Sequence, residues 1–229
     1  MSATRTTTLP GFDGAALAVH EVGEADARPV LLLHGLFSSA EVNWIKYGHA
    51  ATIAARGFRV IMPDFRVHGA SAAPHDAAAY PPQVLVRDVL ALIEAMGLTD
   101  FDLGGFSLGA RTVAALLVEG VRPRRAILAG MGLEGLSGWT DRRQFFLDAI
   151  ALRETVTRDD SHFMAVMFMR TMKIDPVAAT LLLEAGSDID MAALVAVDVP
   201  VAVICGDEDQ DNGSAPALAR QLAHGRYIE

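Results

Sequence analysis

Two patterns of apolar and polar positions alternate along the chain. Short continuous apolar runs are typical of strands buried on both faces of a parallel sheet. Between them, apolar residues recur every three or four positions, which is typical of helices. The expected strands are Ala15–Val22, Pro29–Leu33, Phe58–Met62, Phe101–Phe106, Ala126–Ala129 and Val199–Cys205. The expected helices are Val42–Arg56, Pro81–Met96, Leu108–Glu119 and Ala215–Ala223.

This strand–helix alternation predicts an α/β fold with a mostly parallel sheet covered by helices on both faces. One stretch breaks it, because the pattern between Gly132 and Asp198 is helical throughout. About 65 residues of helix are too many for a single crossover connection. We therefore expect a core formed by residues 1–132 and 197–229 and a helical cap inserted at residues 133–196.

Composition narrows the class of protein. Hydrophobic residues make up 52% of the 229 positions and charged residues 21%, which excludes general disorder. The single cysteine, Cys205, excludes an intrachain disulfide framework. The net charge is −9, and Ile174–Ala219 contains nine acids and no lysine or arginine. This charge argues against nucleic-acid or anionic-membrane partners. We interpret the acidic segment as a solvated face that aids solubility, and the alternative is that it repels anionic substrates.

We find no pattern of an export signal or of a membrane-spanning segment in the sequence. The threonine-rich start of the chain is not followed by the apolar stretch of an export signal. No uncharged apolar run approaches the roughly 18 residues that span a bilayer. We expect a soluble cytoplasmic protein.

The clearest chemical motif is Gly105-Phe106-Ser107-Leu108-Gly109, where an expected strand passes directly into an expected helix. This is the context of the nucleophile elbow G-x-S-x-G, in which a strained turn presents a serine hydroxyl above a sheet. The alternative is a tight glycine turn with an idle serine. We take Ser107 as the candidate nucleophile of an acyl-transfer reaction.

A second motif, His34-Gly35-Leu36, ends the expected strand Pro29–Leu33. In an ester hydrolase the backbone N–H after such a pair faces the oxyanion, and a second N–H comes from the residue after the nucleophile. These donors are the backbone amides of Leu36 and Leu108. We interpret His34 as a hydrogen-bonding residue that shapes the turn rather than as the catalytic base.

Other chemistries fit the sequence poorly. It contains neither the G-x-G-x-x-G dinucleotide fingerprint nor the G-K-[ST] of a phosphate-binding loop. Asp207, Asp209 and Asp211 have the spacing of a calcium loop. However, the glycine comes one place late, at Gly213, and Leu218 stands where a bidentate glutamate is required. We expect no cofactor and no metal.

A third motif, Asp64-Phe65-Arg66-Val67-His68-Gly69-Ala70-Ser71, directly follows an expected strand. With His34-Gly35, the elbow and a late acidic loop, this turn makes the chain resemble the α/β-hydrolase superfamily. The resemblance is to its small-molecule esterase, perhydrolase and C–C hydrolase branches, and it runs from about Thr8 to Tyr227.

The resemblance has several implications. Arg66 and His68 become structural rather than catalytic, and Val67, where the family usually has glycine, has only a local effect. A serine nucleophile excludes the haloalkane dehalogenase and epoxide hydrolase branches, which use aspartate. The acid of the triad lies at the end of G-x-x-D, which is Asp209 here. Asp207 and Asp211 are the alternatives.

The catalytic histidine of the family has no match. It follows the last strand, whose opening Arg226–Glu229 resembles, and the sequence ends there. His20, His34, His49, His68 and His75 precede the nucleophile, His162 falls in the expected cap, and His224 ends a helix. We therefore expect a C-terminally shortened hydrolase whose last strand and helix are missing or incomplete and whose activity is impaired.

Three functions follow from these residues. The first is a serine hydrolase of small to medium uncharged carboxylic esters. The second is a perhydrolase or C–C bond hydrolase, and the third a non-catalytic ligand-binding protein on the same scaffold. A shortened sheet also leaves Val199–Cys205 near an apolar edge, which favours self-association.

Two apolar features remain ambiguous between packing and pocket wall. Met164, Met167, Phe168 and Met172 share one helical face. We interpret this face, and also Trp44 and Trp139, as core packing.

Overall fold

The computed structural model describes residues 3–229, which contain an eight-stranded sheet in the order β1-β2-β4-β3-β5-β6-β7-β8. The first two strands pair antiparallel with their neighbours, and the other six run parallel. The strands are β1 (Arg5–Pro10), β2 (Ala16–Val22), β3 (Arg28–Leu33), β4 (Phe58–Pro63), β5 (Asp102–Phe106), β6 (Ala126–Ala129), β7 (Val201–Ile204) and β8 (Gly225–Ile228).

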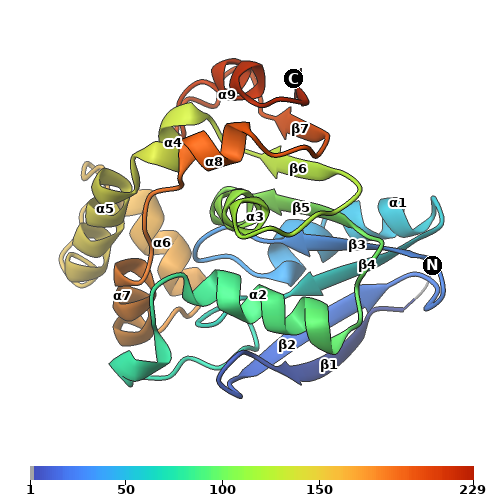
Figure 1. Cartoon of the computed structure of the whole chain (residues 1–229). Helices are drawn as coiled ribbons and strands as arrows, with labels where there is room; N and C mark the ends of the chain where they lie inside the picture. The colour runs from blue at the N-terminus through green and yellow to red at the C-terminus, as the bar shows by residue number, and fades with distance from the viewer. Residues whose placement is uncertain (1–2) are drawn as a thin grey trace.

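Helices surround this sheet. They are α1 (His49–Ala54), α2 (Val84–Ala95), α3 (Leu108–Val118), α4 (Leu133–Ser137), α5 (Trp139–Ala151), α6 (Phe163–Thr171), α7 (Pro176–Glu184), α8 (Met191–Val195) and α9 (Ala215–Gln221). Figure 1 shows α2 and α3 in front of the sheet and α5, α6 and α7 gathered beyond one end of it, on the left. The predicted α/β class with a mostly parallel sheet is confirmed.

Strand β1 was not expected from the sequence. Its residues, Arg5–Pro10, are almost all exposed and include three consecutive threonines, so they carry no apolar run. The strand forms because its backbone pairs with β2 from Arg5–Glu21 to Pro10–Ala16. Threonine is β-branched and suits an exposed edge strand.

Two expected helices are shorter than predicted. The expected helix Val42–Arg56 is divided into a π-helical turn at Glu41–Ile45 and α1, and Gly48 between them has φ 80°. The expected helix Pro81–Met96 begins only at Val84, because Gln83 before it has φ 61°. Both residues have a left-handed backbone, which cannot be part of a right-handed helix, so α1 and α2 begin only after them.

The core lies on both faces of the sheet. Alternate residues of β3 point to opposite sides, so Leu31 and Leu33 join one buried cluster while Val30 and Leu32 join the other. The larger cluster includes α3, which packs on β3, β5 and β6. The smaller cluster lies under α1.

Helices α4 to α8 occupy the chain between β6 and β7, the segment expected to form a cap. In α6 the buried residues are Val166 and Met169. The packing interpretation of the methionine face was wrong for three of its residues, because Met164 is 74% exposed and Met167 and Phe168 are each 38% exposed, whereas Met172 packs against the larger cluster. Trp44 packs against the smaller cluster, and Trp139 is buried in the larger one but also lines a cavity beside Ser107, so it serves as both core and pocket wall.

The expected strand at Arg226–Glu229 is β8, which pairs in parallel with β7. The outer strand on this side is therefore β8 and not Val199–Cys205. None of the helices within residues 3–229 is both long and apolar enough to cross a membrane.

Candidate active site

Ser107 lies in a strained turn between β5 and α3. Its backbone has φ 52° and ψ −111°, a conformation that costs a non-glycine residue on the order of 1–3 kcal/mol. Its N–H donates to Ala129 O at 2.9 Å, which fixes the turn to β6. Such strain persists where the surrounding structure imposes it, and it is concentrated at functional sites.

The two glycines of the elbow are required by close backbone contacts. A Cβ on Gly105 would lie 2.2 Å from the carbonyl carbon of Gly109. A Cβ on Gly109 would lie 2.2 Å from Leu33 O, at the end of β3. Any larger residue would therefore push α3 away from the sheet and move Ser107.

In the described chain the backbone N–H of Leu36 has no hydrogen-bond acceptor, whereas the N–H groups on either side of it are both hydrogen-bonded. Gly35 N–H donates to Asn43 Oδ1 at 2.8 Å, and Phe37 N–H donates to His68 Nε2 at 3.0 Å. Within residues 3–229 no acceptor receives the N–H of Leu36. Leu108 is the first residue of α3, and its N–H likewise has no acceptor in this part of the chain.

His34 and His68 both hold the loop that carries the Leu36 amide. His34 Nδ1 donates to Gly35 O at 2.8 Å, and its Nε2 accepts the N–H of Phe65 at 2.9 Å. His68 Nδ1 donates to Arg66 O at 2.9 Å. Burial lowers the pKa of His34 to about 4 and that of His68 to about 3, so both rings are neutral. These contacts agree with the structural roles expected from the sequence.

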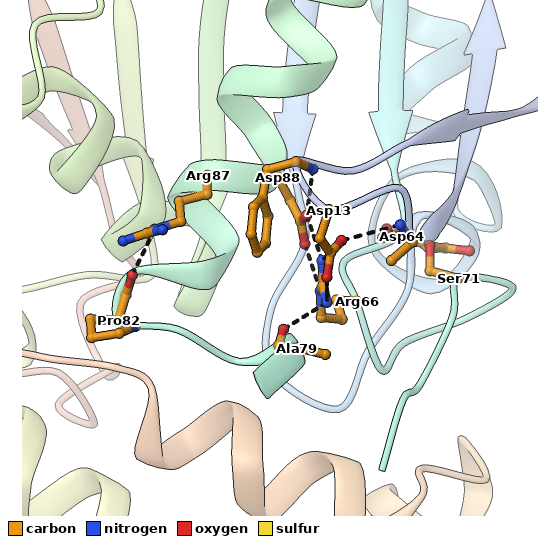
Figure 2. Close-up of polar contacts among 10 residues, drawn as sticks. Asp13, Asp64, Arg66, Ser71, Ala79, Pro82, Arg87 and Asp88 are labelled. Atoms are coloured by element: carbon orange, nitrogen blue, oxygen red, sulfur yellow. Dashed lines mark hydrogen bonds and ion pairs between the residues drawn. The ribbon is translucent and has the colours of Figure 1, made fainter. Parts of the chain in front are cut away.

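Arg66 anchors the turn that carries His68 (Figure 2). Its guanidinium is wholly buried and contacts Asp13 at 2.7 Å and Asp88 at 2.9 Å. Its Nη1 also donates to Ala79 O at 2.7 Å. The hydrogen bond from Arg66 lowers the pKa of Asp13. The N–H groups of Arg66 all donate to these two carboxylates and this carbonyl, so none is left to bind a substrate.

Two cavities meet at Ser107. The first, which we call the aspartate cavity, measures about 250 Å³ and is lined by Leu36, Ser38, Asn43, Ser107, Asp209 and Asp211, among others. The second, the arginine cavity, measures about 20 Å³ and is lined by Leu36, Ser107, Leu108, Arg111, Trp139 and Arg142, among others. The structure thus brings together all four residues that the sequence analysis selected.

The acidic loop after β7 reaches the same place. Asp209 and Asp211 both line the aspartate cavity, and Asp209 is half-buried, whereas Asp211 and Asp207 are exposed. Asp209 Oδ1 accepts the N–H of Asp211 at 3.2 Å. Asn212 is buried and donates through Nδ2 to Gly130 O at 2.8 Å, which fixes this loop beside the elbow.

Histidine is missing from the surroundings of Ser107. No histidine of residues 3–229 lines either cavity. His75, His162 and His224 instead lie 2.8–2.9 Å from the carboxylates of Asp175, Asp160 and Asp198. In the described chain, moreover, no group of three or more His, Cys, Asp or Glu side chains could hold a metal ion.

Sequence reasoning missed several cavity residues. Asn43, Arg142, Phe146, Phe168 and Asn212 line the cavities at Ser107. Their spacing from the motifs carries no signal, because Arg142, Phe146 and Phe168 arrive on α5 and α6, far along the chain. Only the packing of these helices reveals them.

The sheet order and the elbow turn are those of the α/β-hydrolase fold, and part of the chain matches the model of that family. Residues 28–127 match the family model described as alpha/beta hydrolase fold. An esterase from Exiguobacterium antarcticum has a similar structure with a TM-score of 0.76 at 19% identity, covering 98% of this chain and 90% of the esterase. An enol-lactonase from Burkholderia xenovorans LB400 has a TM-score of 0.72 at 23% identity, covering 97% of this chain and 90% of the lactonase.

Curated relatives match over a shorter segment. An epoxide hydrolase from Caballeronia sordidicola is 37% identical over 98 residues, which is 43% of this chain and 28% of the relative. A 1H-3-hydroxy-4-oxoquinoline 2,4-dioxygenase from Pseudomonas putida is 32% identical over 97 residues, which is 42% of this chain and 34% of the relative. The matched part therefore spans about a third or less of these relatives.

Proposed function

We propose that the protein is a serine hydrolase acting on small to medium carboxylic esters through an acyl-enzyme. The supporting observation is that Ser107, with its strained backbone of positive φ, lines the same cavity as Leu36 and Leu108, whose backbone N–H groups have no acceptor within residues 3–229. Two fixed N–H donors stabilise a developing oxyanion, and removing one such donor typically costs about 3 kcal/mol of barrier.

In this reaction Ser107 Oγ forms a bond to the carbonyl carbon while its proton passes to a base. The carbonyl oxygen becomes the oxyanion held by Leu36 and Leu108. The C–O bond to the alcohol then breaks, the alcohol leaves with a proton, and water releases the acid from Ser107. Asp209 is the residue proposed to orient an imidazolium in this site.

Turnover by the described chain is proposed to be weak, because no imidazole lines the cavity with Ser107. Without a general base the serine proton passes only to water, and a neutral serine hydroxyl is a poor nucleophile. Losing the base alone can cost on the order of 10⁶-fold in kcat. The free amides and substrate binding would leave a small residual rate.

The activities named for structurally similar proteins support hydrolysis of esters. An esterase and an enol-lactonase, both similar in structure, act on acyl–oxygen bonds. A structurally similar 2-hydroxy-6-oxo-6-phenylhexa-2,4-dienoate hydrolase keeps a C–C bond hydrolase as an alternative. The expected preference for uncharged esters is inferred from the net negative charge of the protein. The charged residues that line the cavities are a more direct guide to the substrate.

A non-catalytic ligand-binding role is the second candidate function. It is favoured by one observation, the lack of a histidine at Ser107 within residues 3–229. On this reading the elbow and the cavities are retained only to hold a small molecule.

A fluorophosphonate probe distinguishes these functions. We expect slow, time-dependent labelling of Ser107, mapped by mass spectrometry, and slow hydrolysis of a p-nitrophenyl ester. Both signals should vanish in Ser107→Ala. Ser38→Ala is the matched control, since Ser38 lines the same cavity and should leave labelling intact.

Two outcomes count against the proposal. Ester hydrolysis that persists in Ser107→Ala would mean that another group reacts. Rapid turnover by the wild-type chain would contradict the proposed weakness. A site that neither labels nor hydrolyses supports the ligand-binding role.

A further inference from the structure

The arginine cavity contains two guanidinium groups beside Ser107. Arg111 stands on α3, one helical turn after the nucleophile, and Arg142 stands on α5. The two cations are close enough that the charge of Arg142 contributes to lowering the pKa of Arg111. Like charges this near one another are unfavourable unless an anion offsets them.

Arg111 is buried with weak compensation. It donates to the carbonyls of Gly135 at 2.6 Å and Leu136 at 2.8 Å, and also to the carbonyl of Ser187. Its nearest carboxylate, Asp188, lies 3.8 Å away and is half exposed. Burial lowers the pKa of Arg111 to about 10. Its positive charge therefore acts on the cavity with little screening from a partner.

Arg142 has fewer hydrogen-bond partners. Burial lowers its pKa, and the negative charges of Asp211 and Asp209 partly offset this effect. Its Nη1 donates to Asp211 O at 2.6 Å, and within residues 3–229 no carboxylate lies within 4.0 Å of it. Its guanidinium lies 5.7 Å from the centre of the Phe146 ring. Arg142 and Phe146 each line both the arginine cavity and the aspartate cavity. Arg142 therefore has N–H donors left for a bound molecule.

Charge is distributed unequally between the two cavities. Asp209 and Asp211 line the aspartate cavity, but among the described residues no Asp or Glu lines the arginine cavity. The free amides of Leu36 and Leu108 and the N-terminus of the 11-residue helix α3 add further positive potential there. The arginine cavity is thus suited to negative charge, although the whole protein is acidic.

We propose that Arg142 binds a carboxylate on the acyl part of the substrate, with the charge of Arg111 behind it. This proposal rests on the proposed ester hydrolysis at Ser107. The arginine cavity measures only about 20 Å³, which is room for about one water-sized group. It can therefore take the carboxylate alone, and the rest of a short acyl chain lies in the larger aspartate cavity, which Arg142 also lines. The substrate class is a half-ester of a short dicarboxylic acid, whose free carboxylate meets Arg142 while its ester carbonyl meets the amides of Leu36 and Leu108.

The test measures binding, so that it does not depend on turnover. In Ser107→Ala, monomethyl succinate and its neutral counterpart dimethyl succinate are titrated by calorimetry. We expect the half-ester to bind about tenfold more tightly or better, as for a charge-assisted hydrogen bond. Arg142→Gln should abolish this difference by weakening the half-ester to the affinity of the neutral ester. Raising the salt concentration should weaken the half-ester alone.

Arg143→Gln is the matched control, because Arg143 is the adjacent arginine of α5 and lines neither cavity. It should keep the full preference for the half-ester. Arg142→Lys, which keeps the charge and loses the planar donors, should keep part of it. If Arg142→Gln does not fold by circular dichroism, Arg142→Lys and the salt series decide.

Equal binding of the two esters, or a preference that survives Arg142→Gln, would overturn the proposal. If the half-ester bound through the Leu36 and Leu108 amides alone, its preference would survive Arg142→Gln. Failure of the proposed function is separate, since Ser107 would then resist the fluorophosphonate whatever the half-ester does. Labelling of Ser107 together with equal binding would instead leave an esterase for neutral acyl groups.

Discussion

His68 accepts the backbone N–H of Phe37 through Nε2 at 3.0 Å, and the preceding residue, Leu36, lines the cavity at Ser107 with an N–H that has no acceptor within residues 3–229. The ring can accept this bond only while it is neutral. Since the Nδ1 of His68 already donates to Arg66 O, its tautomer is fixed by the turn. A buried structural histidine thus fixes Phe37, the residue next to a proposed oxyanion donor, through a hydrogen bond between positions 31 residues apart.

Stability should fall as the pH falls from about 6.5. Burial lowers the pKa of His34 to about 4 and that of His68 to about 3, compared with the ordinary 6.5. A lowered pKa means that the unfolded state binds protons first, so stability is complete above pH 6.5 and is lost progressively towards the folded pKa values. Urea unfolding at a series of pH values should show the decline.

The histidine contribution can be separated from others. The pKa of His20 is raised by its bond to Asp64, so His20 contributes stability with the opposite sign, present below pH 6.5 and lost as the pH rises through its folded pKa. His68→Gln should flatten the decline, whereas His49→Gln, at the exposed start of α1, should leave it unchanged. A stability that is constant between pH 7 and about 4.5 would contradict the buried neutral rings.

Arg66→Met should destabilise the fold strongly. Removing one partner of a buried ion pair leaves the carboxylates of Asp88 and Asp13 unpaired and typically costs about 3–5 kcal/mol. Arg87→Met is the control, because Arg87 is exposed and donates to Pro82 O alone, at 3.1 Å (Figure 2). Chemical denaturation of both variants gives the comparison. A loss below about 1 kcal/mol for Arg66→Met would show that the network is dispensable.

Gly109→Ala should disrupt the elbow. Its new Cβ would lie 2.2 Å from Leu33 O, which is backbone and cannot move aside cheaply. We expect a loss of unfolding free energy of about 2 kcal/mol or more, together with loss of Ser107 labelling. Gly206→Ala is the control for stability, since a Cβ there meets nothing within 4 Å. Full labelling of Gly109→Ala would show that the elbow tolerates a wider turn.

Self-association through the sheet edge remains a prediction. Strand β8 is the outer strand, and its Ile228 is 38% exposed. Edge strands with apolar residues pair readily with another chain. Light scattering should show an average mass that rises with concentration and falls in Ile228→Lys. Val177→Lys, at an exposed apolar position on α7, should change nothing. A monomer at every concentration would argue against this prediction.

Much of the fold could be predicted from local patterns, because buried parallel strands are continuous apolar runs. Predicted strands such as Phe58–Met62 and Ala126–Ala129 match β4 and β6 to within one residue. Strand β1 could not be predicted in this way, since its stability comes from pairing with β2 and not from burial. The breaks at Gly48 and Gln83 depend on left-handed backbone that the helical pattern hides.

The sequence by itself determined the elbow motif, because Gly105 and Gly109 leave the room that the strained turn at Ser107 needs, although the contact that requires Gly109 is made by Leu33 of β3. It also determined the alternation that builds the sheet. Only the tertiary structure decided which amides stay unoccupied, since the acceptors of Gly35 and Phe37 come from Asn43 and His68. It alone also brought Arg142 to Ser107, because contacts between distant helices depend on packing and leave no mark in local spacing.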